Sequence, residues 1–273
     1  MNRLEQLRKY IAGYDSALIA FSGGVDSTFL AKVAADVLGE QVLLVTATSC
    51  TYPASELADA ERLAGQLGLR HRVIVSEEIE IPEFAQNTPD RCYHCKHELF
   101  SKLGAMARKD GLAAVFEGST VDDLSDYRPG TRAIKELGII SPLLETGFTK
   151  NEIRFFSGEL HLETAEKPSY ACLASRFPYG ETITREKLSR VAAAEEEMKK
   201  LGLRQFRVRS HENLARIEVA PAEIERGWEL RSEIDDLCRK AGFTYTALDL
   251  RGYRTGAMNE ALRLNDGNIG TEP

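Results

Sequence analysis

AFSGGVDST, residues 20–28, is the stretch that decides the fold of this 273-residue chain. It follows a short apolar run at 17–21, of the kind that forms buried strands, and it precedes a helical pattern at 27–38. Gly23 and Gly24 can adopt backbone angles closed to other residues, which lets a ligand approach the main chain. The helix directs free N–H groups and the positive end of its dipole at the loop. The stretch therefore predicts a phosphate-binding loop between a strand and a helix.

Polar side chains belong to the same loop. Ser22, Ser27 and Thr28 supply hydroxyl donors, and Asp26 is placed to hold Mg²⁺ or to orient the loop. The lysine of a Walker loop is missing, so the pattern does not favour transfer of a γ-phosphoryl group. A glycine-rich turn followed by a helix cap is the structural alternative. Six matching residues in a strand–loop–helix context favour the nucleotide loop over it.

Strand-like and helix-like segments alternate through the first half of the chain. The sequence predicts buried strands at 41–47, 72–75 and 113–117 and helices at 53–67, 99–108 and 133–137. Residues 141–144 are predicted as a strand or a turn. Such alternation is typical of a parallel sheet covered by helices, so the predicted fold class is α/β.

The character of the sequence changes near residue 167. Residues 168–184 are loop-like, and 185–201 form a strongly charged helix pattern in which Glu195, Glu196 and Glu197 are expected to be solvated. Half-exposed strands at 204–209 and 214–219, a helix at 221–241 and a strand at 244–250 follow. We therefore expect a parallel-sheet domain at 1–167 and a smaller α+β domain at 168–273.

A second polar segment, EGSTVDDLSDYRPG at 117–130, follows the strand predicted at 113–117. That position is the carboxyl edge of the sheet, where such sheets bind ligands. Asp122, Asp123 and Asp126 suit Mg²⁺ there, and Arg128 suits a phosphate. Taken alone, the segment fits a surface turn with solvated acids equally well.

The chain contains five cysteines. Cys92 and Cys95 form a CxxC pair at the start of a helix, and Cys172 lies in a loop. Three thiolates with one open position match a [4Fe–4S] cluster with a vacant iron. Zinc would require a fourth ligand, and a redox dithiol lacks its usual fold context. Cys50 and Cys238 are expected to pack.

Composition and charge argue against several classes of protein. The chain is 43% hydrophobic and 28% charged, as is typical of globular enzymes. No apolar run approaches the roughly 20 residues that cross a bilayer, and the N-terminus has an amphipathic helix pattern rather than that of a signal peptide. We expect a cytoplasmic protein without a membrane partner. The net charge of −7 argues against nucleic acid as the main partner.

The loop SGGVDS at 22–27 resembles the PP-loop of the ATP-pyrophosphatase superfamily, and nearly the whole chain resembles the ATP-dependent sulfur transferases of the LarE type. The second resemblance rests on DYRPG at 126–130, PSYACLASRFPYG at 168–180, RVRSHENLARIEV at 207–219 and DLRGYRTGAMNE at 249–260. It implies a PP-loop domain of the adenine nucleotide α-hydrolase type, followed by the smaller α+β domain.

The resemblance implies that ATP adenylates a carboxylate of a pyridinium-dicarboxylate mononucleotide and that pyrophosphate leaves. A sulfur donor then attacks the acyl-adenylate and releases AMP, giving a thiocarboxylate on the way to the nickel-pincer nucleotide cofactor. The sulfur is either a sulfide on a [4Fe–4S] cluster held by Cys92, Cys95 and Cys172, or the sulfur of Cys172 itself. The CxxC pair favours the cluster, because the sacrificial chemistry needs only Cys172.

The resemblance also implies the residues of the site. Catalysis is expected at Cys172, Asp26, Ser175 and Arg176, and Mg²⁺ on Asp26 or Asp123. The expected ATP contacts are Ser22, Gly23, Gly24, Val25, Asp26, Ser27, Thr28, Ala47, Gly118, Asp122 and Arg128. Arg207 and Arg209 share one face of a strand, as Arg216 and Glu218 do on the next, because alternate residues point the same way. Arg207, Arg209 and Glu218 are expected at the substrate phosphate, which guanidinium groups suit.

Three rival functions stay open at this point. A PP-loop tRNA thiolase would activate a nucleobase carbonyl, and an amide-forming synthetase using ammonia would need no cysteine. A nucleotide-binding protein without turnover would release no pyrophosphate. The expected partner is a small nucleotide substrate, and the family implies a homo-oligomer. The sequence does not indicate the upstream sulfur donor.

Overall fold

The computed structural model describes residues 2–125, 129–168, 171–254 and 256–260, so that the predicted site residues Asp126 and Arg128 lie outside the described part. The chain forms two compact units. The first contains residues 1–84 and 89–170, and the second contains residues 85–88 and 171–273.

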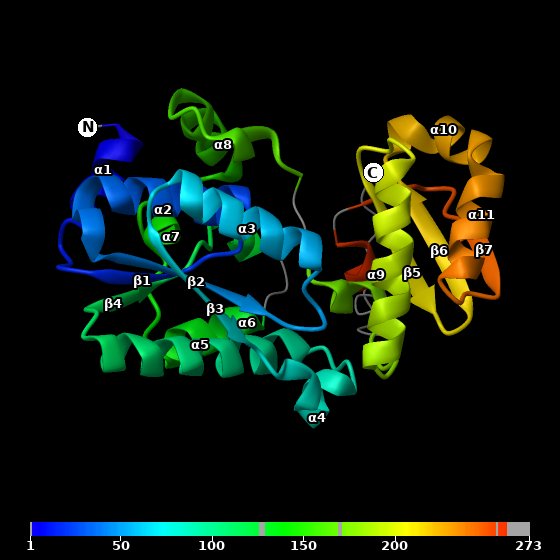
Figure 1. The fold of residues 1–273 in the computed structure, drawn as a ribbon, viewed down its shortest axis with the longest axis horizontal. Helices are drawn as coiled ribbons and strands as arrows, with labels where there is room; N and C mark the ends of the chain where they lie inside the picture. Colours follow the sequence, from blue (N-terminus) through cyan, green and yellow to red (C-terminus); the bar gives the residue numbers. More distant parts are fainter. Residues whose placement is uncertain (1, 126–128, 169–170, 255, 261–273) are drawn as a thin grey trace. The chain divides into compact units, whose positions relative to one another are not determined.

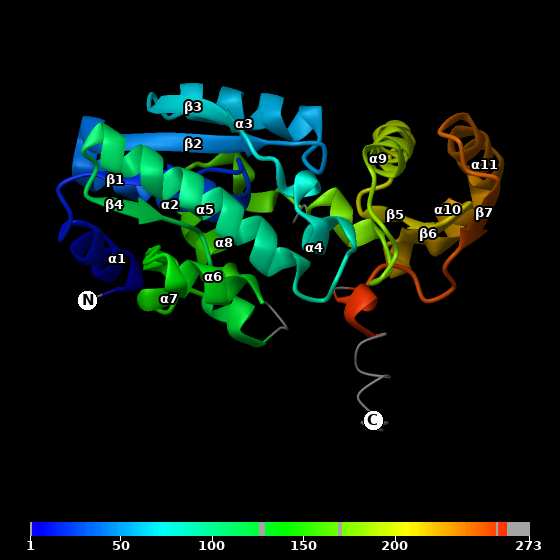
Figure 2. The same cartoon turned by 90° about the horizontal axis from the view of Figure 1, so that it is seen from below.

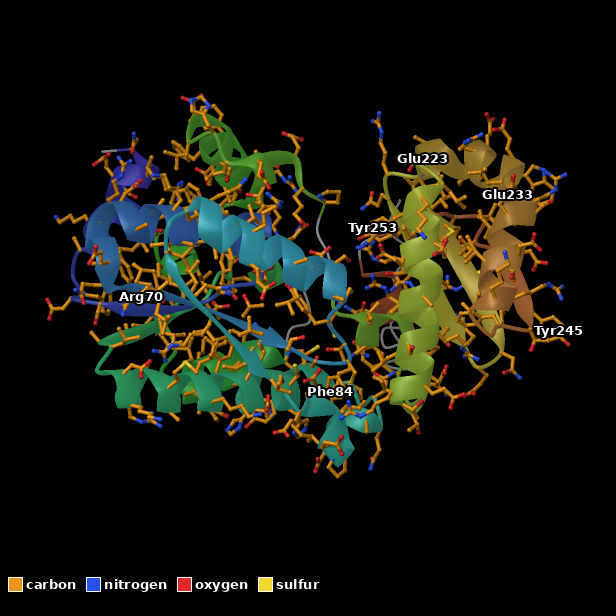
Figure 3. All side chains as sticks on the ribbon, in the orientation of Figure 1. Arg70, Phe84, Glu223, Glu233, Tyr245 and Tyr253 are labelled. Atoms are coloured by element: carbon orange, nitrogen blue, oxygen red, sulfur yellow. The ribbon has the colours of Figure 1, made fainter. Side chains whose placement is uncertain are left out.

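The first unit is built on a four-stranded parallel sheet (Figure 1). Its strands are β1 (Ala17–Ala20), β2 (Val42–Thr48), β3 (Arg70–Val75) and β4 (Ala114–Phe116), in the order β3-β2-β1-β4. Arg70 begins the edge strand β3 (Figure 3). The α/β fold with a parallel sheet, predicted from the alternation of segments, is confirmed.

Helices cover both faces of this sheet (Figure 1). Successive strand residues point to opposite faces, so Ile19 packs with one helix layer and Leu18 with the other. The first layer contains α1 (Arg3–Ile11), α2 (Val25–Leu38), α3 (Ala54–Gln66) and α8 (Lys150–Glu159), and the second contains α5 (Arg91–Asp110) and α6 (Gly130–Glu136). The carboxyl edge of the sheet is left to loops.

Two helices of this unit differ from the prediction. Helix α5 begins at Arg91, before the bound of 99 predicted for it, and it includes the CxxC pair, which was expected at the start of a helix. Helix α8 was not predicted at all, although Thr149 and Glu152 form a capping box at its start. Both starts are polar, so apolar periodicity alone did not reveal them.

Shorter elements complete the chain. Residues 141–144, predicted as a strand or a turn, belong instead to helix α7 (Pro142–Glu145), because Pro142 suits the first turn of a helix. The other short helical elements are α4 (Pro82–Ala85), η1 (Gly39–Gln41), η2 (Glu78–Glu80), η3 (Val121–Ser125), η4 (Glu163–Glu166), η5 (Leu173–Arg176), η6 (Pro221–Glu223) and η7 (Ala257–Asn259).

The second unit has a three-stranded sheet with helices α9 (Arg185–Lys200), α10 (Ile224–Glu229) and α11 (Arg231–Lys240) (Figure 2). Strand β5 (Phe206–His211) is antiparallel to β6 (Leu214–Val219), and β6 is parallel to β7 (Tyr245–Leu248), whose exposed Tyr245 is seen in Figure 3. The predicted order helix–strand–strand–helix–strand is confirmed, except that the helix predicted at 221–241 divides at Leu230. Within the described residues, no helix is long and apolar enough to span a bilayer.

Candidate active site at the carboxyl edge of the parallel sheet

The phosphate loop connects the end of β1 to the start of α2, as predicted. Gly23 has a φ of +65°, and a Cβ atom there would lie 3.0 Å from the Cα of Ala60 on α3. Both the backbone angle and the close approach therefore require glycine. Gly24 is the N-cap residue of α2 and offers no side-chain hydrogen bond. The first amide groups of this helix are thus not capped by its N-cap side chain, which suits an anion.

Hydroxyl groups shape the loop from inside. The Oγ of Ser27 accepts a hydrogen bond from the amide of Ser22 (3.3 Å), donates to the carbonyl of Gly24 (3.3 Å) and lies 3.1 Å from the Oγ of Ser22. The phenol of Tyr52, from the loop after β2, donates to the carbonyl of Ser22 (2.8 Å). The two serines therefore fold the loop, and Tyr52 fixes it to the neighbouring loop.

The loop after β4 reaches the start of α2. A Cβ atom on Gly118 would lie 3.4 Å from the amide nitrogen of Ser27, so the absence of a side chain keeps this helix start open. The buried carboxylate of Glu117 holds the turn by accepting hydrogen bonds from Ser119 and from the hydroxyl of Ser141. The two segments singled out by the sequence are therefore neighbours at one edge of the sheet.

Asp26 is the central acid of this edge. Its Oδ2 lies 3.0 Å from the Nζ of Lys150, while no hydrogen-bond donor among the described residues reaches its buried Oδ1. Burial raises the pKa of Asp26, and the nearby Asp123 adds to this, whereas the charges of Lys150 and Arg154 oppose it. A half-satisfied carboxylate next to a second acid fits a divalent cation. Asp26 and Asp123 are therefore the residues that suit Mg²⁺ here.

Two lysines that sequence reasoning missed lie at this edge. Lys150 begins α8 and contacts Asp26, and its amide donates to Asp122 (2.8 Å). Lys167 donates to the carbonyl of Gly23 (3.3 Å), and its Nζ lies 3.0 Å from carboxylate oxygens of Glu56 and Asp59. The capping box at Thr149 could have revealed the helix that positions Lys150. Nothing in the sequence pattern places Lys167 beside the loop.

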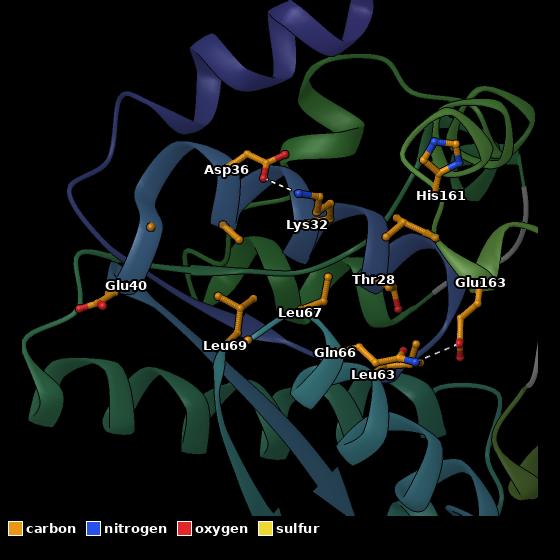
Figure 4. Close-up of a pocket in the computed structure, with 14 residues that line it drawn as sticks. Thr28, Lys32, Asp36, Glu40, Leu63, Gln66, Leu67, Leu69, His161 and Glu163 are labelled. Carbon is orange, nitrogen blue, oxygen red and sulfur yellow. Dashed lines mark hydrogen bonds and ion pairs between the residues drawn. The ribbon is translucent and has the colours of Figure 1, made fainter.

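A cavity of about 710 Å³ lies between α2, α3 and residues 161–163 of the first unit (Figure 4). Thr28 is the member of the phosphate loop in its lining, and Lys32 and Asp36 line it further along α2. Ser22, Gly23 and Asp26 are not in this lining. We therefore place the candidate site at the loop edge and not in this cavity. Ala47, an expected ATP contact, lies near the carboxyl end of β2.

No disulfide joins the five cysteines, all of which lie in the described part of the chain, and three of them are the predicted cluster ligands. Cys92 is exposed and Cys95 half-buried at the start of α5, where their spacing of three places them on one side of the helix. Cys172 is exposed and belongs to the second unit. Over the described residues, no group of three or more His, Cys, Asp or Glu is arranged for a metal ion. The cluster therefore stays a prediction.

The segment that carries Cys172 is held by a buried ion pair. Arg176 is 0% exposed and donates through Nε (2.8 Å) and Nη2 (2.9 Å) to the carboxylate of Glu195 on α9. Its Nη1 donates to the carbonyls of Ala171 (2.8 Å) and Cys172 (3.3 Å) and to the Oγ of Ser175 (2.9 Å). Arg176 therefore reaches the backbone on both sides of the thiol.

Glu195 was predicted to be solvated, and that prediction is wrong. The side chain is 3% exposed and also accepts a hydrogen bond from the amide of Val208 (3.0 Å). Burial alone would raise the pKa of Glu195, but the Arg176 charge and these hydrogen bonds outweigh it and hold the pKa below its ordinary value. Glu196 and Glu197 are exposed, as predicted. Three consecutive acids look alike in sequence, and only the packing of α9 separates them.

The arginine face of the second unit is formed by the paired strands β5 and β6. Arg207 lies opposite Glu218, and Arg209 lies opposite Arg216. The prediction of half-exposed strands is wrong for β5, because Arg207 is 8% and Arg209 is 5% exposed. Ser175, Asp249 and Tyr253 contact arginines of this face, and alternation along the strand did not predict these contacts.

These arginines have defined partners. Arg209 donates to Oε2 of Glu218 through Nε (3.0 Å) and Nη2 (2.7 Å), and to the carbonyl of Ser175 (2.9 Å). Arg216 pairs with Asp249 and lies 3.2 Å from Oε1 of Glu218. The guanidinium of Arg207 lies 5.0 Å from the centre of the Tyr253 ring. Three arginines and two carboxylates give this face an excess of positive charge.

Comparison with known proteins finds similar sequences over most of this chain. Residues 16–123, which include the phosphate loop and most of the sheet, match the asparagine synthase family. An uncharacterized protein of Synechocystis sp. is 45% identical over 96% of this chain and 98% of its own length. The pyridinium-3,5-bisthiocarboxylic acid mononucleotide synthase of Lactiplantibacillus plantarum is 38% identical over 89% of each chain. An uncharacterized protein of Methanocaldococcus jannaschii is 29% identical over 87% of this chain and 90% of its own length.

The extent of these matches decides the family. The similarity to the Lactiplantibacillus synthase continues through both units, whereas the asparagine synthase match ends at residue 123, within the first unit. The resemblance inferred from the PP-loop and the Cys172 segment is therefore confirmed. The chain belongs to the LarE-type family of ATP-dependent sulfurtransferases, the family of the pyridinium-3,5-bisthiocarboxylic acid mononucleotide synthase.

Proposed function

We propose that this chain adenylates a carboxylate of a pyridinium-dicarboxylate mononucleotide with ATP and converts it to a thiocarboxylate, a step toward the nickel-pincer nucleotide cofactor. The arrangement around Asp26 carries the proposal. A helix start without a side-chain cap, a buried carboxylate with an unsatisfied oxygen, and the ammonium groups of Lys150 and Lys167 meet at one sheet edge. That arrangement suits the polyphosphate of ATP with its cation.

Adenylation makes the carboxylate reactive. A carboxylate oxygen attacks the α-phosphorus of ATP, the bond to the bridging oxygen breaks, and pyrophosphate leaves. The loop of Ser22, Gly23 and Gly24, with the amides that follow at Val25, Asp26, Ser27 and Thr28, is proposed to hold the two departing phosphates. Mg²⁺ on Asp26 and Asp123 would neutralise charge on the leaving group. Gly118, Asp122 and Ala47 are proposed to complete the nucleotide contacts.

Sulfur transfer then replaces AMP. Sulfur at the oxidation level of hydrosulfide attacks the acyl carbon, and the bond from this carbon to the AMP oxygen breaks. A proton is released together with AMP. The site for this step is proposed at Cys172, which is exposed and held by Arg176 and Ser175.

The substrate is proposed to be bound through its ribose phosphate by the arginine face of the second unit. Arg207 and Arg209 carry guanidinium groups, which suit phosphate oxygens, and Glu218 orients Arg209 from the opposite strand. The excess positive charge of this face would also attract a phosphate. Removing a partner from such a buried pair costs several kcal/mol, roughly 3–5, so Glu218 is needed for order as well.

The proposal is tested by supplying ATP, Mg²⁺ and the pyridinium-3,5-dicarboxylic acid mononucleotide to the protein. Pyrophosphate release that depends on the mononucleotide, with a product in which sulfur replaces oxygen by mass spectrometry, is the expected result. Bulk tRNA and ammonia are the comparison substrates. Release with tRNA and none with the mononucleotide would replace the proposal with a tRNA thiolase.

For the sulfur source, we propose a [4Fe–4S] cluster on Cys92, Cys95 and Cys172. Three accessible thiols with one iron left open suit such a group, which supplies a carrier for an additional sulfide when bound. Anaerobic reconstitution with iron and sulfide is expected to give about four irons per chain, measured by colorimetric iron analysis. Cys92→Ser is expected to lose the iron, and Cys50→Ser, a thiol outside the proposed set, is expected to retain it.

The competing source is the sulfur of Cys172 itself. An iron-free protein after reconstitution, together with a turnover-dependent mass loss that maps to Cys172 and matches dehydroalanine, would contradict the cluster proposal. The two sources leave different products on the protein. Intact mass measurement before and after a single turnover therefore separates them.

A further inference from the structure

Lys167 is held at the phosphate loop by three separate contacts. Its ammonium group donates to the carbonyl of Gly23 at 3.3 Å and lies 3.0 Å from both Oε2 of Glu56 and Oδ2 of Asp59. Only 19% of the side chain is exposed. Burial alone would raise the pKa of Asp59, but the hydrogen bond and charge of Lys167 lower it overall. The lysine therefore lies in a defined position and does not move freely in solvent.

The backbone of the same residue is fixed as well. Arg154, on α8, donates through Nη2 to the carbonyl of Lys167 (2.9 Å) and through Nη1 to the carbonyl of Ala165. Helix α8 packs against α2, whose first turn follows the loop. The backbone and the side chain of Lys167 are thus both held by residues in or next to the phosphate loop.

The position of the ammonium group decides what it can contact. Gly23 lies inside the loop and has a positive φ, and its carbonyl is the group that Lys167 touches. Any anion held by the loop amides lies within a few ångströms of that carbonyl. A lysine with three N–H donors can keep one carboxylate partner and still donate to a phosphate oxygen. The carboxylates of Glu56 and Asp59 cannot bind an anion themselves, so their role is to position the lysine.

We infer that Lys167 is a ligand of the terminal phosphates of ATP and of the pyrophosphate product, oriented by Glu56 and Asp59. The inference rests on the proposed function, because it requires the loop to hold these phosphates. A positive charge there stabilises the negative charge that develops on pyrophosphate as it leaves. AMP lacks the two terminal phosphates, so the contribution of Lys167 is specific to pyrophosphate and ATP.

Ligand binding to the purified full-length protein tests this. Lys167→Gln is expected to weaken binding of magnesium pyrophosphate about 10- to 100-fold, as for the loss of one charge-assisted hydrogen bond, and to leave AMP binding unchanged. Isothermal titration calorimetry with each ligand measures both. Lys167→Arg is expected to restore part of the pyrophosphate affinity. Lys102→Gln is the matched control, since Lys102 also contacts two carboxylates but lies on α5.

The outcomes separate this inference from the proposed function. If the unchanged protein binds neither pyrophosphate nor AMP, the proposed function fails. If it binds both, and Lys167→Gln binds pyrophosphate as tightly as the unchanged protein, only the role of Lys167 is overturned. Equal weakening of pyrophosphate and AMP would also overturn it, because that result indicates general disturbance of the loop.

Discussion

Cys172→Ala is expected to abolish thiocarboxylate formation, by at least about 10³-fold, while the first round of pyrophosphate release is retained. The reason is that Cys172 supplies the sulfur chemistry in both proposed routes, whereas adenylation uses residues of the first unit. Without sulfur transfer the acyl-adenylate is not discharged, so roughly one pyrophosphate per chain is expected in a rapid first phase. Quenched-flow measurement of pyrophosphate and mass spectrometry of the nucleotide product check both parts.

The control for this experiment is Cys50→Ala, which removes a half-buried thiol outside the proposed set. That variant is expected to form thiocarboxylate as the unchanged protein does. The substitution at residue 172 should not disturb folding, because its side chain is exposed and Arg176 binds the backbone there. Thiocarboxylate formation retained in Cys172→Ala would remove this thiol from the chemistry.

Asp26→Asn is expected to reduce pyrophosphate release about 10²- to 10³-fold without lowering thermal stability. The loss of activity follows from losing the charged oxygen proposed for Mg²⁺. Stability should hold or rise because burial raises the pKa of Asp26, which means that the ionised carboxylate is less favourable in the folded chain than in the unfolded one. Steady-state pyrophosphate assays and thermal denaturation at neutral pH measure the two effects.

The pH dependence of stability gives an independent check on Asp26. A folded pKa above the unfolded value means that the native state binds the proton more tightly, so this group's contribution to stability falls as pH rises through that range. The asparagine variant is expected to lack this part of the slope. For activity the sign is opposite, since Mg²⁺ needs the ionised form. Asp36→Asn, on the same helix and paired with Lys32, is expected to change neither activity nor this slope.

If Asp26→Asn keeps full pyrophosphate release, the cation is not held there, and Asp123 is the next candidate. If the variant loses several kcal/mol of stability, the ion pair with Lys150 outweighs the burial of the acid. Each result therefore identifies which of the two charges near Asp26 dominates. The Asp26 side chain is 22% exposed, so solvent screens its charge. Screening limits both the ion pair with Lys150 and the effect of burial.

Much of the first unit followed from local sequence rules. The loop at 22–27 required glycines at fixed places, and the apolar runs of β1, β2 and β4 were long enough to identify a buried parallel sheet. Helix α8 was not predicted because its polar first turn shows no apolar periodicity, even though its capping box was present. Local rules therefore identified elements with strong apolar or glycine patterns and missed α8, whose first turn is polar.

The amino-acid sequence alone determined the strand–loop–helix unit, the α/β class, the order of elements in the smaller unit and the family. Each of these depends on short-range periodicity or on a compact motif. Tertiary structure decided which charges matter. It brought Lys150 to Asp26 and Lys167 to Gly23, and it buried Glu195 beside Arg176 while leaving its neighbours in solvent. Those contacts join residues up to 144 positions apart, as for Lys167 and Gly23, and only packing of the whole chain brings such residues together.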